Sequence, residues 1–437
     1  MADSRELSRR AFLKRGTRLG AVGFLSQSLC SCSGQEAKAA AAPRLVLSTA
    51  LAGTGRPGPN DRIGVGYIAV GRRARGLLGL PKGAQIVAIS DVNEKRLDEV
   101  GKDKPWKKYP DYRKMLEDPD VDAVVISTPD HWHALNAIHA MQAGKDVYCE
   151  KPMTLTVREG RLMVDAARKY KRVFQTGSQQ RSMHECRLGC ELIRNGRIGK
   201  IKLVHGSNYP SPLERCDAPA EPVPEGLNWD MWCGPTKPRP FNAKLYLPRP
   251  HPTGWISYRP YSGGEMTGWG AHGLDIIQWA LGMDASGPVE VWPVGSGRTC
   301  PVHFRYANGI EVHLDGKAPG GGGLFEGEKG KLLVARRKLE TWPKEIAKEP
   351  LAAGDVRLYK SDHHMLNWIE CIRTRKRPIC DVEIGARSVT VCHLGNLAYW
   401  YRRKLRWDPK RWQFVDDAEA NGWLDRERRD PWQLPTV

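Results

Sequence analysis

The residue with the clearest chemical potential is Lys151, in the sequence Glu-Lys-Pro at 150–152. It closes the segment AGKDVYCEKP, which begins at Ala143 and follows the apolar run VDAVVIS and the polar residues at 128–133. This order predicts a strand that delivers side chains to the carboxyl edge of a parallel sheet, where ligands bind. A lysine buried there can exchange protons near neutral pH. The alternative is a solvated lysine on a surface turn.

A second candidate site precedes it. Residues 63–70 form an apolar run, and the stretch Ala69-Val70-Gly71-Arg72-Arg73-Ala74 aligns with the fingerprint GxGxxG, in which backbone N–H groups bind a pyrophosphate. Gly71, which permits close backbone approach, is kept, whereas alanine replaces the first glycine. Arg72 and Arg73 either pair with phosphate or face solvent.

Asp91 supports this nucleotide site. It lies twenty residues after Gly71, at the end of a second apolar run over 84–90. A carboxylate there accepts hydrogen bonds from the ribose hydroxyls and repels a 2′-phosphate, so we expect NAD rather than NADP. The alternative is that Asp91 only caps the following helix.

The elements that must position these residues alternate between strand and helix. Helices are expected from about Arg75, over 94–100, 112–117, 133–143 and 158–170, and strands over 63–70, 84–90, 122–127, 146–149 and 173–176. This alternation predicts a doubly wound parallel sheet of the Rossmann type. After residue 178 the pattern changes to helices at 184–195 and 270–281, strands across 289–334, and helices at 364–373 and 384–401.

We therefore expect an α/β protein with a Rossmann domain over 61–178. A mixed α/β domain with a large open, mostly antiparallel sheet follows over 179–437. Residues 43–60, rich in Gly, Pro, Ala and Thr, are expected to be a linker.

Residues 1–42 have the form of a twin-arginine export signal. Arg9 and Arg10 precede an apolar stretch that is too short to span a bilayer, and alanines 39–42 suit cleavage. Cys32 is an alternative processing point that would carry a lipid. We expect export to the periplasm, against the alternative of a basic tail.

Charge and cysteines limit other functions. The formal net charge of +19 comes from scattered basic residues with no zinc finger or RNA-binding strand, so a solvated cationic surface is expected and nucleic acid is not. The eleven cysteines include no CxxC pair. They are expected to be buried thiols rather than disulfides, and no metal site is predicted.

Taken together, these motifs resemble the Gfo/Idh/MocA oxidoreductases. The resemblance is carried by the fingerprint, by Asp91, and by the stretches TPDHWH, EKP, QTGSQQR (175–181), GGEMTGWGAHGLD (263–275) and LGNLAYWYRRKLRWDP (394–409). It implies NAD bound in the first domain, and a second domain whose open sheet carries sugar contacts and often a subunit interface.

The resemblance also assigns roles to individual residues. Lys151 is implied as the catalytic lysine, His272 as the catalytic histidine and Asp275 as the last acid of the pattern GGxxxDxGxHxxD. The cofactor is expected to contact Thr128, Pro129, His131, Glu150 and Pro152, and the substrate Arg181, Tyr258, Glu265 and His272. Without the resemblance, His272 is also consistent with a core histidine.

One position departs from the pattern. The first acid falls on Gly268, which has no side chain. Lys151 and His272 must then act without it, or Glu265 or Tyr258 must substitute.

Three functions remain open at this point. The first is an NAD-dependent dehydrogenase that oxidises a sugar or polyol hydroxyl. The second is a redox-neutral NAD-dependent glycosidase that oxidises transiently and eliminates. The third is a non-catalytic sugar-binding or scaffold protein. An exported enzyme would need tightly bound NAD, and we expect a homo-oligomer formed through the second sheet.

Overall fold

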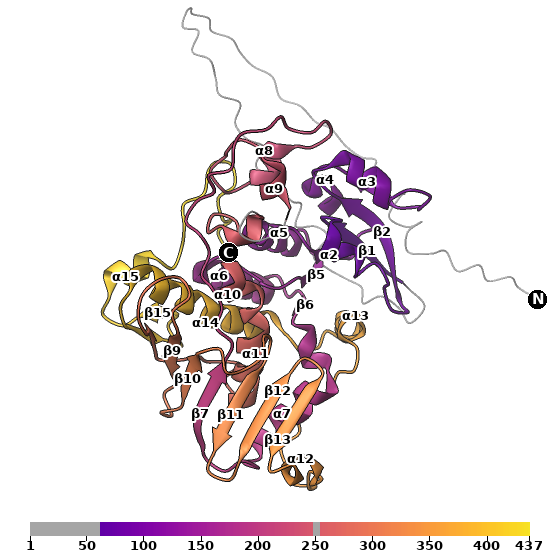
Figure 1. Ribbon diagram of the computed structural model, residues 1–437. Coiled ribbons are helices and arrows are strands. Elements are labelled where there is room, and N and C mark those ends of the chain that lie inside the picture. Colours follow the sequence, from indigo (N-terminus) through magenta and orange to yellow (C-terminus); the bar gives the residue numbers. More distant parts are fainter. Residues whose placement is uncertain (1–61, 248–253) are drawn as a thin grey trace, which may run out of the picture. The chain divides into compact units, whose positions relative to one another are not determined.

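The computed structural model describes residues 62–247 and 254–437, which belong to one compact unit spanning Val46–Val437 (Figure 1). The expected export signal, the linker at 43–60 and Cys32 lie outside the described residues. Among the described residues, none of the helices has the length and apolarity needed to cross a bilayer.

The first sheet has six parallel strands in the order β3-β2-β1-β4-β5-β6. The strands are β1 (Ile63–Ile68), β2 (Ala84–Ser90), β3 (Lys107–Tyr109), β4 (Ala123–Ile126), β5 (Asp146–Cys149) and β6 (Phe174–Thr176). β1, β4 and β5 are buried throughout, as expected for central parallel strands covered on both faces. The predicted Rossmann sheet is confirmed.

The helices of this region differ from expectation at two places. They are α2 (Arg72–Arg75), α3 (Glu94–Val100), α4 (Tyr112–Leu116), α5 (Asp130–Gln142) and α6 (Val157–Lys169). α2 is a single turn that ends where a helix was expected to begin. α5 starts at Asp130 instead of His133, because the polar residues after Pro129 are buried inside the helix rather than exposed in a loop.

The second sheet has nine strands in the order β13-β12-β11-β7-β10-β9-β8-β14-β15. The strands are β7 (Ile201–Gly206), β8 (Glu290–Pro293), β9 (Val302–Arg305), β10 (Glu311–Leu314), β11 (Gly323–Gly327), β12 (Lys331–Ala335), β13 (Lys338–Trp342), β14 (Leu405–Asp408) and β15 (Gln413–Phe414). Only β7 and β10 pair in parallel, so the expected mostly antiparallel sheet is confirmed.

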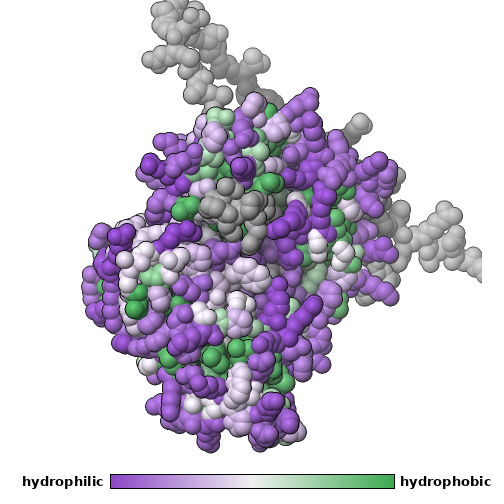
Figure 2. All heavy atoms as spheres, viewed as in Figure 1, coloured by the Kyte–Doolittle hydropathy of each residue, from purple (hydrophilic) through white to green (hydrophobic). Residues whose placement is uncertain are grey.

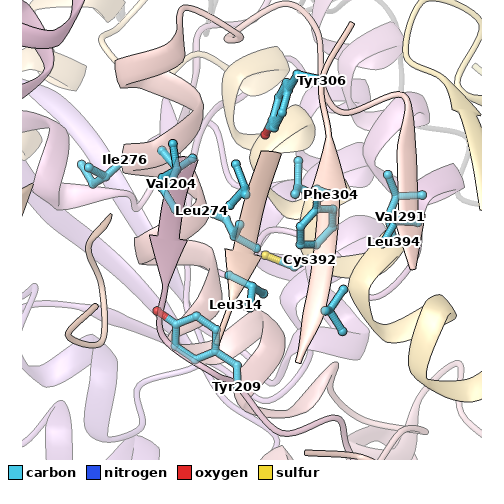
Figure 3. Packing of buried hydrophobic residues seen from close by; sticks show 14 of the residues in the cluster. Val204, Tyr209, Leu274, Ile276, Val291, Phe304, Tyr306, Leu314, Cys392 and Leu394 are labelled. Atoms are coloured by element: carbon cyan, nitrogen blue, oxygen red, sulfur yellow. The ribbon is translucent and has the colours of Figure 1, made fainter. Parts of the chain in front are cut away.

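Helices pack on one face of this sheet. The helices of the second part are α7 (His184–Arg194), α8 (Trp229–Cys233), α9 (Ala243–Tyr246), α10 (Gly264–Gly268), α11 (Gly270–Leu281), α12 (Glu345–Lys348), α13 (His364–Thr374), α14 (Val382–Tyr401) and α15 (Ala418–Gly422). Leu274 of α11 and Leu394 of α14 meet Val204 and Phe304 of the sheet in a buried apolar cluster (Figure 3). This packing fixes α11, which carries His272.

Two late helices complete the first domain. Trp368 of α13 is fully buried, and its ring lies 5.7 Å from that of Tyr148 on β5. α14 packs against α6, where a Cβ on Gly160 would lie 3.5 Å from the Cβ of Ala386. These contacts hold the carboxyl edge of the first sheet against the second domain.

The surface polarity and the burial of the cysteines agree with what the composition predicts. The face in Figure 2 is mostly hydrophilic. The described cysteines are free, and all except Cys216 are buried.

Candidate functional site

A cavity of about 560 Å³ opens at the carboxyl edge of the first sheet. Its walls include residues after β1, β2, β4 and β5, and the second part of the chain closes it with Met231, Trp232 and Trp255. Of the sequence-predicted cofactor residues, those that line it are Ala69, Gly71, Arg72, Arg73, Asp91, Thr128, Pro129, Glu150, Lys151 and Pro152.

The turn after β1 keeps the geometry of the fingerprint despite the alanine. Ala69 has φ +67°, a left-handed conformation that glycine adopts without cost and that costs alanine roughly 1 kcal/mol. A Cβ on Gly71 would meet nothing within 4 Å, so the backbone there faces open space. The turn can therefore receive the phosphates of a dinucleotide next to the first turn of α2.

Asp91 is fixed at the end of β2. Its Oδ2 accepts a hydrogen bond from the Val70 N–H at 2.9 Å, and its Oδ1 accepts one from the Asn93 N–H at 3.0 Å. The side chain that caps α3 is that of Asn93, not Asp91. Asp91 is therefore available to the cavity, which it lines.

Arg96, which sequence reasoning missed, also lines this end of the cavity. Its Nη1 lies 3.3 Å from both oxygens of Asp91, and its guanidinium lies 5.3 Å from the ring centroid of Tyr246. No local motif marks Arg96, because its partner Tyr246 comes from α9, far along the chain.

The other cofactor-side residues hold one another. Arg73 donates a 2.6 Å hydrogen bond from Nη2 to Glu150 Oε1. His133 bridges the loops after β4 and β5, with Nδ1 2.8 Å from the Pro152 carbonyl oxygen and Nε2 3.0 Å from that of Thr128. The two loops are therefore locked together at the cavity floor.

Lys151 lies at the junction of the cavity and the second domain. Its Nζ donates a 3.0 Å hydrogen bond to the Gly268 carbonyl oxygen. Burial lowers the pKa of Lys151, and the nearby carboxylates of Glu150, Asp130 and Glu265 oppose that shift. The lysine is thus a partly buried group suited to exchanging a proton.

Gly268, the position that lacks the expected acid, lies next to the carboxylate of Glu265. A Cβ on Gly268 would lie 3.2 Å from Glu265 Oε2, one turn earlier in α10. The Glu265 carboxylate thus occupies the space into which a side chain at 268 would point. Of the two substitutes expected from the sequence, Glu265 is the one near Lys151.

Asp130, at the start of α5, is a further candidate that sequence reasoning did not single out. It lines the cavity, and Ser262 donates a 2.6 Å hydrogen bond from Oγ to its Oδ2. Burial raises the pKa of Asp130 to about 7, while Ser262 and Lys151 act in the opposite direction. Lys151 and Asp130 therefore form a pair whose pKa values are shifted towards each other.

His272, in the first turn of α11, lies beside these groups. Its Nε2 is 3.2 Å from Nη2 of Arg336, and its ring lies 5.6 Å from that of Trp269. Burial and the charges of Lys151, Arg336 and Arg73 hold the pKa of His272 well below its usual range. The imidazole is therefore neutral.

Two expected site residues lie in a buried network of polar side chains. Arg181 and Asp275 are each 1% exposed and form a bidentate ion pair, with Arg181 Nη2 2.8 Å from Asp275 Oδ1. Arg181 also pairs with Asp284, and Ser388 donates to Asp275. None of Arg181, Asp275, His272 and Glu265 lines the cavity. The polar atoms of Arg181 and Asp275 are engaged in this buried network, which favours a structural role for both. A substrate-binding Arg181 and a catalytic Asp275 stay predictions.

His131 and Tyr258 do not line the cavity either. The Nε2 atom of His131 lies 2.9 Å from the Trp232 carbonyl oxygen. Tyr258 is buried in an aromatic cluster with Trp229 and Trp232. Side-chain direction, which sequence position did not reveal, explains both differences.

One group in the described part of the chain has donor atoms close enough for a metal: His303, Glu311 and His313 on β9 and β10. None of them lines the cavity.

The comparisons with known proteins agree with this geometry. Residues 63–178 match the model of an oxidoreductase family with an NAD-binding Rossmann fold, and residues 213–434 match the C-terminal alpha/beta domain of that family. The chain belongs to this family, Gfo/Idh/MocA, and its first domain is an NAD-binding domain.

Individual relatives show the range of activities in the family. The chain is 32% identical over 190 residues to an inositol 2-dehydrogenase of Acidothermus cellulolyticus, covering 42% of this chain and 56% of that protein. It is 32% identical over 212 residues to a glycosyl hydrolase family 109 protein of Shewanella, covering 45% and 44%. The matches span about half the length of these relatives.

Among solved structures, the WlbA dehydrogenase of Bordetella pertussis, crystallised with NADH and UDP-GlcNAcA, has a similar fold. The TM-score is 0.57 and the identity 21%, over 79% of this chain and 99% of that one.

The ion pair of Arg181 and Asp275 predicts that removal of the Asp275 carboxylate lowers the stability of the protein. We expect Asp275→Ala to lower the free energy of unfolding by about 3–5 kcal/mol, because Arg181 keeps its buried charge without its main partner. Urea denaturation measures this. The control Asp98→Ala removes an exposed pair with Lys108 and should cost at most about 1 kcal/mol. Lost turnover with unchanged stability would instead favour a catalytic Asp275.

Asp130 predicts a pH dependence of stability. Its pKa is raised in the folded protein to about 7, from 3.8, so its contribution is present at low pH and is lost as pH rises through that range. The loss is up to about 1.4 kcal/mol per pH unit. In Asp130→Asn the side chain stays neutral and this loss should disappear, as measured by urea denaturation at about pH 4 and about pH 8. Asp98→Asn is the control, and an identical slope in wild type and Asp130→Asn would contradict the assignment.

Proposed function

We propose that the protein is an NAD-dependent oxidoreductase that acts on a hydroxyl of a sugar or polyol. The observation that carries the proposal is the partly buried Lys151 between the dinucleotide-sized cavity and the group formed by Gly268, Glu265 and His272. The similarity to an inositol 2-dehydrogenase supports the class of substrate.

Some residues of the site would bind the cofactor, and others would transfer the proton. Gly71 and α2 receive the phosphates, while Asp91 accepts from ribose hydroxyls. Bound NAD supplies the acceptor for a hydride from the carbon that carries the hydroxyl. Lys151 lies where it can take the hydroxyl proton or polarise the oxygen, and Asp130 and Glu265 can relay that proton because both carboxylates interact with Lys151.

A redox-neutral glycosidase is the second candidate. The similarity to a glycosyl hydrolase family 109 protein raises this alternative without favouring it over the dehydrogenase. Several groups that can transfer a proton, Asp130 and Glu265 among them, lie near Lys151. An elimination that follows transient oxidation needs a second acid or base, for which Glu265 or His272 would serve. Net formation of reduced nicotinamide supports the dehydrogenase, whereas release of nitrophenol from nitrophenyl glycosides without it supports the glycosidase.

We also propose that residues 1–42 direct export and that the protein retains NAD tightly. The proposal rests on the paired arginines and the apolar stretch after them. Fractionation of cells tests export, with a variant in which Arg9 and Arg10 are changed to lysine as the control. Mass spectrometry of the purified protein tests whether it retains the nucleotide. We further propose that the protein assembles into a homo-oligomer through the second sheet, on the basis of its resemblance to the Gfo/Idh/MocA family.

Lys151→Met is expected to lower kcat by at least about a hundredfold, because it removes the group that exchanges the proton while keeping the apolar stem. NAD binding by calorimetry should change little. Polyols and sugars are offered with NAD, and the absorbance of reduced nicotinamide is followed. Lys114→Met, at an exposed helix position, is the matched control. Unchanged turnover in Lys151→Met would refute the role.

Glu265 predicts a rescue. Glu265→Ala should lower kcat by about a hundredfold, because the carboxylate beside Lys151 is lost. Gly268→Asp added to that variant should recover about tenfold, because the new carboxylate points into the space that the shortened side chain at 265 leaves. Steady-state kinetics of the two variants and of Gly268→Asp alone measure this. Loss of activity in the double variant equal to that in Glu265→Ala would count against a shared role.

A further inference from the structure

Arg336, on the turn between β12 and β13, lies beside His272 and does not line the cavity. Its Nη2 donates to His272 Nε2 at 3.2 Å, and its Nε donates to Gln180 Oε1 at 3.2 Å. Its guanidinium also lies 5.3 Å from the ring centroid of Trp269. Gln180 is itself buried and fixed by a 2.7 Å hydrogen bond to the Gly321 carbonyl oxygen. The guanidinium is therefore held in a defined orientation.

All three of these partners are neutral. Within residues 62–247 and 254–437, no carboxylate forms an ion pair with Arg336, whereas Arg73 has Glu150 and Arg181 has two aspartates. Burial and the nearby charge of Arg73 lower the pKa of Arg336. Arg336 is exposed to solvent, so an incoming anion can reach its oriented guanidinium. The fork of donors on a guanidinium matches the oxygens of a carboxylate or a sulfate.

The contact with His272 has a chemical consequence. A guanidinium only donates hydrogen bonds, so Nε2 of His272 must accept and the ring proton must sit on Nδ1. The lone pair that would accept a substrate proton is therefore occupied by Arg336. Nδ1 is buried and has no hydrogen-bond partner in the described part of the chain. An anion that drew Arg336 away would free Nε2 to act as a base.

Trp269 supplies a surface for a ring beside this charge. It is one of the exposed large hydrophobic residues, at 39% exposure, although it directly precedes the buried helix α11. An indole face packs well against the apolar face of a sugar. Arg336 and Trp269 thus offer a charge and a stacking surface next to His272.

We propose that Arg336 binds an oxyanion carried by the sugar, a carboxylate or a sulfate, while Trp269 packs against the sugar ring. The substrate class is then an acidic sugar. This inference rests on the proposed function, which concerns the same site.

Calorimetry on the NAD-loaded protein tests the inference with glucuronate, glucose 6-sulfate and glucose as probes. We expect at least one of the two acidic sugars to bind about tenfold or more tightly than glucose, since a charge-assisted contact contributes roughly that factor. Added salt should weaken this preference. Arg336→Gln should abolish it, and Arg336→Lys should keep only part of it. Arg337→Gln, which changes the exposed neighbour on the same turn, should retain it.

Comparison of the two acidic sugars identifies the oxyanion. Three outcomes would overturn the inference. They are equal affinity for glucose and both acidic sugars, no measurable binding of either acidic sugar, and a preference for an acidic sugar that survives in Arg336→Gln. The comparison of sugar affinities in the wild-type protein tests the inference even where a variant fails to fold. Preferential binding of an acidic sugar without reduction of NAD would leave this inference standing and would reject the dehydrogenase.

Discussion

The structure of the site depends on a single constraint, the partial burial of the Lys151 ammonium. A charge partly removed from water needs polar partners, and this one has the Gly268 carbonyl oxygen as hydrogen-bond acceptor and the carboxylates of Glu150, Asp130 and Glu265 nearby. Those groups come from the first domain and from α10 of the second. The lysine therefore links the two domains at the point where the cavity ends.

The same constraint explains the unusual protonation of the neighbours. Burial raises the pKa of Asp130 and lowers those of Lys151 and His272, so the group holds fewer charges than the residue types suggest. Groups tuned in this way can pass a proton with little energetic cost. By contrast, the more deeply buried Arg181 and Asp275 pair fully and stabilise the fold rather than exchange protons.

The departure at Gly268 concerns one position of the family pattern. The Glu265 carboxylate lies one helical turn earlier, in the space that a side chain at 268 would use. The proposal that Glu265 substitutes for the missing acid rests on this proximity. Arg336 adds a feature that the family pattern did not indicate, because it belongs to a turn between two strands of the second sheet.

The sequence by itself determined the order of strands and helices, the parallel first sheet, the mostly antiparallel second sheet and the family, because hydrophobic periodicity and local motifs record these features directly. It also gave Gly71, Asp91 and Lys151, which lie at strand ends. Tertiary structure decided the direction and partners of side chains. His131 turned towards Trp232, Asp275 joined Arg181, and Arg96 and Arg336 entered the site. These outcomes depend on contacts between residues distant in the chain, which no local pattern encodes.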